Sequence, residues 1–170
     1  MLRTHCQTSG ASLAEQDPYN NVIRTTIEAL AATLGGTQSL HTNSFDEAIA
    51  LPTPFSARIA RNTQLILQHE AGITDAVDPL AGSYFVEAMT DRMEQETYNY
   101  FEKVEAIGGV IPAIERGFVQ REIAEAAYRY QMEIDTHQRV VVGINELTED
   151  EPIRIPLLQM DPEGYERQVA

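Results

Sequence analysis

The chain of 170 residues is 43% hydrophobic and has a formal net charge of −14. The apolar fraction is enough for a folded core, whereas the acidic balance argues against a surface for nucleic acid or anionic membranes. The single cysteine, Cys6, excludes an intramolecular disulfide framework, and no Cys/His set has the spacing of a zinc site. The sequence shows no apolar run as long as a membrane span and no signal peptide, so we expect a cytoplasmic protein.

Extended and helical patterns alternate along the first half of the chain. Residues 2–8 are predicted to be extended, and residues 17–36 to form a helix between an Asp-Pro pair and a Gly pair. Residues 37–42 predict a second extended segment, and residues 45–51 predict a helix that stops at a proline. Apolar residues at helical spacing predict another helix over residues 56–72.

The second half begins with a third strand-like segment, GSYFVEAM at residues 82–89. A helix is expected to follow it and to end at Gly108-Gly109. Two shorter helical segments are predicted at residues 114–117 and 123–134. The β-branched run RVVVGIN, residues 139–145, predicts a fourth strand, and the acidic segment ELTEDEPIRIP is typical of an exposed linker.

This alternation of strands and helices predicts an α/β fold with parallel strands. Polar residues gather where strands end and helices begin, and in a (β/α)8 (TIM) barrel those ends form the ligand-binding face. Three βα units are too few to close an eight-stranded barrel, so we expect part of a barrel that is incomplete by itself. Residues 1–135 are predicted to form these units with trailing helices, and residues 136–170 a strand-like segment and a linker towards the remainder.

The stretch GGTQSLHTNSFDEAIALPT, residues 35–53, has an unusual density of hydrogen-bonding groups. One interpretation is helix capping by Asn43, Ser44 and Asp46, and for any one of them alone we favour it by about two to one. Capping uses one or two groups, however, and more are present. His5 and His41 have no carboxylate or second histidine at useful helical spacing, so we predict no metal site. The residues alone predict half of a ligand site on barrel loops.

Four longer motifs extend this interpretation: RTHCQTSGASLAEQDPYNNVIRT, GGTQSLHTNSFDEAIALPT, SARIARNTQLILQHEAGI and DPLAGSYFVE. Together they closely resemble the adenosylcobalamin-dependent acyl-CoA mutases, and the resemblance runs over residues 2–147. Mutases acting on isobutyryl-, 2-hydroxyisobutyryl- or ethylmalonyl-CoA share SLHTN but vary around QTSG and DPYNN. The form in this chain resembles the methylmalonyl-CoA branch, the large catalytic subunit in particular.

The resemblance implies the C-terminal portion of a TIM barrel and a radical isomerase, an intramolecular transferase that interconverts (R)-methylmalonyl-CoA and succinyl-CoA. Its expected cofactor is adenosylcobalamin, whose cobalt ligand would come from a separate cobalamin-binding domain outside these residues. Expected partners are the acyl-CoA substrate and the remainder of the mutase chain or a companion subunit. No catalytic residue and no metal ligand are expected in this chain, so the isolated chain is predicted to be inactive.

Individual residues acquire roles from the resemblance. Asn43 and Glu47 match positions that bind the adenosyl ribose, and Ala50 lies where the family's chain touches the cofactor. Gly10 matches a glycine beneath the corrin, and Gln7 belongs to the same mouth of the barrel. The substrate and its pantetheine chain are expected to contact three further residues, His5, Gln38 and Ser39.

Two positions depart from the family pattern, because Ala11 and Leu80 stand where tryptophans are usual. The small Ala11 side chain would therefore pack differently against the corrin than the usual tryptophan. Other hypotheses are also open: a piece of one of the related acyl-CoA mutases, a nonfunctional remnant that acts as an interaction module, or a self-contained binding module of a different fold. An incomplete barrel leaves strand edges uncovered, so we also expect the chain to associate.

Overall fold

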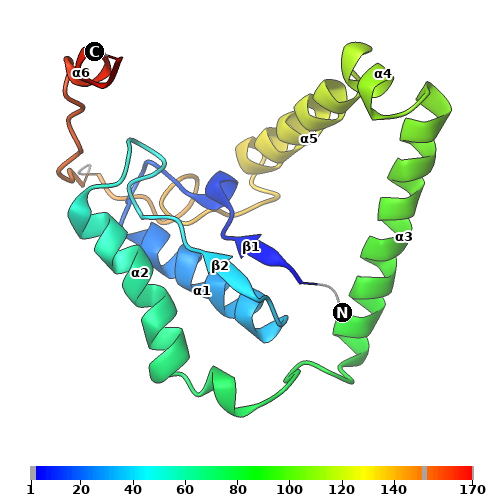
Figure 1. Ribbon diagram of the computed structural model, residues 1–170, viewed down its shortest axis with the longest axis horizontal. Coiled ribbons are helices and arrows are strands. Elements are labelled where there is room, and N and C mark those ends of the chain that lie inside the picture. The colour runs from blue at the N-terminus through cyan, green and yellow to red at the C-terminus, as the bar shows by residue number, and fades with distance from the viewer. Residues whose placement is uncertain (1–2, 151–152, 170) are drawn as a thin grey trace. The chain divides into compact units, whose positions relative to one another are not determined.

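The computed structural model describes residues 3–150 and 153–169. Contacts divide the chain into a first unit, Met1–Pro79 with Glu149–Ala170, and a second unit, Leu80–Thr148. The elements of the first unit are β1 (His5–Gln7), the 3-10 turn η1 (Gly10–Ser12), α1 (Asn20–Leu34), β2 (Ser39–His41), α2 (Pro54–His69), the 3-10 turn η2 (Ile73–Asp75) and α6 (Gly164–Val169). Figure 1 labels its strands and α-helices.

Strands β1 and β2 pair in parallel, with His5 opposite Ser39 and Gln7 opposite His41. This βαβα order confirms the α/β arrangement expected for the first two units. Because side chains alternate along a strand, these four residues share one face of the two-stranded sheet, and all four are exposed. The alternate positions are half-buried, and helix α1 contacts both β2 and α2.

Helix α1 ends where the glycine pair was predicted to stop it, and Gly36 has a φ of +81°. Its start differs from the prediction. Asp17 has a φ of +47° and does not cap the helix; its Oδ2 accepts a hydrogen bond of 2.6 Å from Nδ2 of Asn20, the first helical residue. An aspartate tolerates this left-handed conformation, which turns the chain once more before the helix begins.

The buried face of α1 is made of small and polar residues, namely Asn21, Thr25 and Ala29. The apolar positions that revealed the helix in the sequence lie elsewhere, and Ile23 and Ile27 are 59% and 62% exposed. Periodicity therefore identified the helix but not the face that it buries in this structure.

Residues 45–51 form turns and not the predicted helix. The backbone oxygen of Asp46 accepts hydrogen bonds of 2.9 Å from the amides of Ile49 and Ala50. The helix that follows, α2, begins two residues earlier than predicted because Thr53 is its N-cap, with Oγ1 accepting from the Ser56 amide at 3.1 Å.

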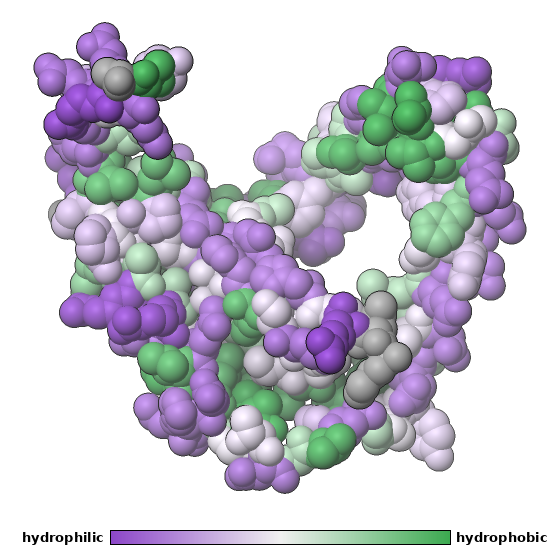
Figure 2. Space-filling view, viewed as in Figure 1, coloured by the Kyte–Doolittle hydropathy of each residue, from purple (hydrophilic) through white to green (hydrophobic). Residues whose placement is uncertain are grey.

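The second unit contains α3 (Tyr84–Ile107), α4 (Val110–Glu115) and α5 (Phe118–Asp135). The prediction of a strand at residues 82–89 is wrong, because the Ser83 side chain accepts a hydrogen bond from the Val86 amide and caps a 24-residue helix. The helix ends as predicted at Gly108, where a φ of +110° favours glycine. Figure 2 shows apolar surface gathered over α4, where Val110 and Ile111 are 64% and 71% exposed.

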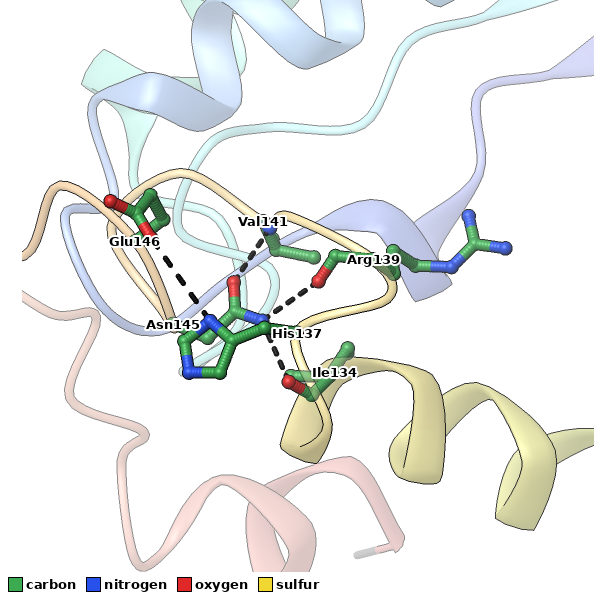
Figure 3. Close-up of polar contacts among 6 residues, drawn as sticks. All are labelled: Ile134, His137, Arg139, Val141, Asn145 and Glu146. Carbon is green, nitrogen blue, oxygen red and sulfur yellow. Dashed lines mark hydrogen bonds and ion pairs between the residues drawn. The ribbon is translucent and has the colours of Figure 1, made fainter.

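The strand predicted at residues 139–145 is also absent, and the segment is a compact loop after α5 (Figure 3). The Asn145 side chain organises it. Its Nδ2 donates to the backbone oxygens of Ile134 and Arg139, and its Oδ1 accepts from the Val141 amide, each at 2.8 Å. Two of these groups, the Arg139 oxygen and the Val141 amide, are ones that a strand partner would otherwise use.

Of the predicted linker, residues 146–156, the first residues end this loop and residues 153–156 have no regular structure, while residues 151 and 152 lie outside the described part. Among the described residues, no helix has the length and hydrophobicity needed to cross a membrane.

Candidate functional site

The two loops that follow β1 and β2 lie at the same edge of the sheet, because the strands are parallel. The first loop contains Gly10, and the second contains Asn43, Glu47 and Ala50. The residues expected to hold a cofactor are therefore collected at the carboxyl ends of the strands, where ligands bind in parallel α/β folds.

Asn43 is the centre of the first cluster and is only 4% exposed. Its Oδ1 accepts hydrogen bonds from Thr8 Oγ1 at 3.0 Å and from Gln7 Nε2 at 3.3 Å. Its backbone amide donates to Thr8 Oγ1 at 2.9 Å. A Cβ added to Gly10 would come within 3.3 Å of Asn43 Nδ2, which is closer than most side-chain contacts. The structure thus brings Gln7, Gly10 and Asn43 together.

Glu47 and Asp46 both reach the hydroxyl of Ser44. Asp46 Oδ1 accepts from Ser44 Oγ at 2.7 Å, and Glu47 Oε1 lies 3.3 Å from the same oxygen and accepts from the Ser44 amide at 3.0 Å. Among the described residues, hydrogen bonds reach Glu47 through Oε1, which leaves Oε2 for another donor. Glu47 is half-buried, whereas Asp46 is 1% exposed.

The Asp46 carboxylate also holds the end of the second loop, because its Oδ2 accepts from the Thr53 amide at 3.2 Å. Together with the turns at Ile49 and Ala50, this contact folds residues 44–53 around one buried carboxylate. Capping of a following helix by Asn43, Ser44 or Asp46 is contradicted, since Thr53 caps α2.

His5, Gln38 and Ser39, the residues expected to contact substrate, lie towards the amino ends of the strands. His5 Nδ1 is 2.8 Å from Ser39 Oγ across the exposed face of the sheet. Gln38 Oε1 accepts from the Thr4 amide at 2.6 Å. His5 and Ser39 are thus paired, and Gln38 lies beside them at the start of β2.

A cavity of about 490 Å³ opens next to β2 and α2 in the first unit, and Gln38 and Ser39 contribute to its wall. Its other polar lining residues are uncharged: Thr33, Thr37, Gln64, Gln68 and Thr74. The described residues include no group of three or more histidines, cysteines, aspartates or glutamates arranged to hold a metal ion.

Sequence reasoning missed two residues that organise the site. Thr8 connects the loop after β1 to Asn43, and Asn21 of α1 reaches the backbone of both loops. No local pattern in the sequence signals these contacts. The partner of Thr8, Asn43, lies 35 residues further along the chain, and Phe45, which Asn21 contacts, lies 24 residues further.

Comparisons with known proteins assign the family. A family model described as methylmalonyl-CoA mutase matches residues 1–170. Methylmalonyl-CoA mutase of Rhizobium meliloti is 60% identical over 161 residues, which are 95% of this chain and 23% of that protein. The large subunit from Porphyromonas gingivalis is 53% identical over 98% of this chain and 23% of its own length. The mitochondrial mutase of Bos taurus is 51% identical over 95% of this chain and 22% of its own length.

Proposed function

Because the chain belongs to the methylmalonyl-CoA mutase family, we propose that it is a segment of an enzyme that interconverts (R)-methylmalonyl-CoA and succinyl-CoA with adenosylcobalamin. The chain spans less than a quarter of the curated relatives it matches, 23% in Rhizobium meliloti. The activity therefore belongs to a larger assembly, in which other residues supply the cobalt ligand and the groups that grip the acyl group. We place this assembly in the cytoplasm.

The donors and acceptors at the loop edge suit the proposed cofactor. Gln7, Thr8 and Asn43 present neutral amide and hydroxyl groups, which match a ribose and a rim of amides. A Cβ at Gly10 would crowd Asn43 Nδ2, so the glycine leaves room for this amide. We propose that the missing side chain also lets a flat ligand approach the Gly10 backbone. Glu47 Oε2 is available to accept from a sugar hydroxyl, and the backbone of Ala50 completes the edge. When bound, adenosylcobalamin supplies the radical chemistry of the rearrangement.

The exposed sheet face suits the acyl-CoA. His5, Gln38 and Ser39 are hydrogen-bonding groups on or beside this face, and the pantetheine arm offers amides and a hydroxyl to such groups. We propose that this face is the inner wall of a TIM barrel of which β1 and β2 are two neighbouring strands. Side chains on that wall would then orient the substrate and exclude water from it.

The meeting of Gln7, Gly10 and Asn43 is the observation that carries the proposal, because residues 33 to 36 positions apart along the chain come into contact, and the resemblance implies a cofactor role for each of them. The test is a chimera in which this chain replaces the matching segment of the Rhizobium meliloti mutase. We expect the chimera to isomerise methylmalonyl-CoA when adenosylcobalamin is added. A chimera that folds but turns over only isobutyryl-, 2-hydroxyisobutyryl- or ethylmalonyl-CoA, or no acyl-CoA, would contradict the proposal.

Glu47→Gln in the same chimera tests the proposed ribose contact. We expect kcat to fall about ten-fold or more, since about 1.4 kcal/mol of lost transition-state stabilisation is a factor of ten. The melting temperature should move little, because glutamine keeps an oxygen for the Ser44 amide. Glu15→Gln, at an exposed carboxylate of the preceding loop, is the matched control. Equal turnover in Glu47→Gln and Glu15→Gln would remove Glu47 from the site.

A further inference from the structure

Asn21 is a fully buried amide in the first turn of α1, with 0% of its surface exposed. Its Nδ2 donates to the backbone oxygen of Ala14 at 2.7 Å and to that of Phe45 at 2.9 Å. Its Oδ1 accepts from the Ala14 amide at 3.0 Å and from Arg24 Nη1 at 2.8 Å. Both amide hydrogens and the carbonyl oxygen are therefore engaged.

These contacts connect the two loops of the candidate site. Ala14 lies four residues after Gly10 in the first loop, and Phe45 lies between Asn43 and Glu47 in the other loop. A single side chain thus holds one point on each loop, and both points are backbone groups, so the contact restrains where the loops run. Arg24 holds the oxygen of the amide and so orients it.

Helix α1 has a second contact with the first loop, because Glu28 Oε2 accepts from the Ser9 amide at 2.6 Å. The helix therefore holds Ser9 and Ala14, on either side of Gly10, through side chains two turns apart. Among the described residues, the second loop has one hydrogen bond from α1, which Asn21 Nδ2 donates to the Phe45 oxygen.

We infer that Asn21 is a positioning residue, which sets the spacing between the two loops so that Gly10, Asn43 and Glu47 act on one ligand. This inference rests on the proposed function and adds a residue that does not itself touch the ligand. If the loops adopt the competent spacing only part of the time, the apparent affinity for the cofactor falls by that fraction.

Helix formation does not require an asparagine at this position, because asparagine is a poorer helix former than alanine. Thr25, one turn further along the same buried face, provides the matched control. It is 2% exposed, and its Oγ1 has no hydrogen-bond partner among the described residues. Thr25→Val keeps the side-chain shape and therefore reports on a general disturbance of the buried face of α1.

Hydrogen exchange in the 170-residue chain tests the restraint directly. We expect Asn21→Ala to accelerate exchange about ten-fold or more in residues 9–14 and 43–53, with a smaller change in α1. Asn21→Asp keeps an acceptor for the Ala14 amide but loses both donations, so it should release the second loop more than the first. Thr25→Val should release neither. If either folded Asn21 variant leaves both loops protected, or releases α1 equally, the inference is wrong.

The chimera described above supplies a kinetic readout that a merely structural role would not produce. In it, Asn21→Ala should raise the KM for adenosylcobalamin about ten-fold, while the KM for methylmalonyl-CoA changes less than about two-fold. An active parent chimera with an unchanged cofactor KM in the variant would overturn the inference and leave the proposed function intact. An inactive parent would count against the proposed function, and the exchange experiment would still decide the role of Asn21.

Discussion

The two units of the molecule bury very different residues. The first unit buries several polar side chains, and the hydrogen bonds of the candidate site lie around five of them: Thr8, Asn21, Asn43, Ser44 and Asp46. In the second unit, α3 has 24 residues and buries none of them, while α4 and α5 each bury one, Ala113 and Ile134.

This contrast shows which backbone segments are held in place by buried polar side chains. Hydrogen bonds from a buried side chain to a distant backbone group restrain both distance and direction, and leaving such a group unpaired is costly. They are concentrated around the two loops of the candidate site. The helices of the second unit are formed by caps and glycine stops, with apolar residues such as Met93 and Ile123 exposed at 67% and 64%.

The largest expected effect contrasts two phenylalanines. Phe45 is 5% exposed, and its ring lies 5.4 Å from that of Tyr19 and 6.2 Å from that of Phe55, measured between centroids. Phe45→Ala should lower the free energy of unfolding of the first unit by about 3–5 kcal/mol. Phe101 is 57% exposed, and its ring pairs with that of Tyr98 in the second unit. Phe101→Ala should lower the free energy of unfolding of that unit by about 1 kcal/mol or less.

Amide exchange read separately in each unit measures both effects, because each unit then reports its own opening free energy. Equal losses for Phe45→Ala and Phe101→Ala would mean that the two units do not differ in packing as the structure indicates.

A smaller effect is expected at the buried carboxylate of Asp46. The two oxygens of the Asp46 carboxylate accept from Ser44 Oγ and from the Thr53 backbone amide. In Asp46→Asn an NH2 group replaces one of these oxygens, so one of the two donors faces another donor. The first unit should lose about 1–3 kcal/mol of stability. Asp91→Asn, at an exposed aspartate of α3, is the control and should leave the second unit unchanged. Urea unfolding followed by exchange in each unit checks the pair; a neutral Asp46→Asn would show that the loop does not depend on this carboxylate.

The smallest effect concerns pH and the second unit. Tyr100 Oη donates to Glu122 Oε2 at 2.7 Å, connecting α3 to α5. This hydrogen bond and the negative charge of Glu122 raise the pKa of the Tyr100 phenol above its ordinary value of 10.0. The pKa of Tyr100 is higher in the folded chain than in the unfolded chain. The hydrogen bond to Glu122 therefore stabilises the fold fully at a pH below the unfolded pKa, and this stabilisation is lost as the pH rises through the folded pKa.

Ultraviolet titration of the phenols measures this shift. Subtracting the Tyr100→Phe titration from that of the parent should give a phenol that ionises above its ordinary range, and Glu122→Gln should return it towards that range. A Tyr100 phenol that titrates identically with and without the Glu122 carboxylate would exclude this contact between α3 and α5.

The family, the parallel βα order of the first two units, and the ends of the helices at Gly35-Gly36 and Gly108 were all predictable from the sequence. These features follow from residues that are neighbours along the chain. A glycine that adopts a positive φ ends a helix wherever the helix lies, and long motifs retain their order in any fold.

Tertiary structure alone decided which polar residues are buried and what they hold. Asn21 contacts Phe45 at a separation of 24 residues, and Thr8 contacts Asn43 at 35. Competition with local signals also explains the wrong predictions. Residues 45–51 have a helical pattern but form turns, and the Asp46 carboxylate accepts a hydrogen bond from the Thr53 amide. Asn145 takes backbone groups of Arg139 and Val141, in a segment rich in β-branched residues. Periodicity reports the local preference of the backbone, whereas a hydrogen bond across the fold exists only after the chain has returned to its partner.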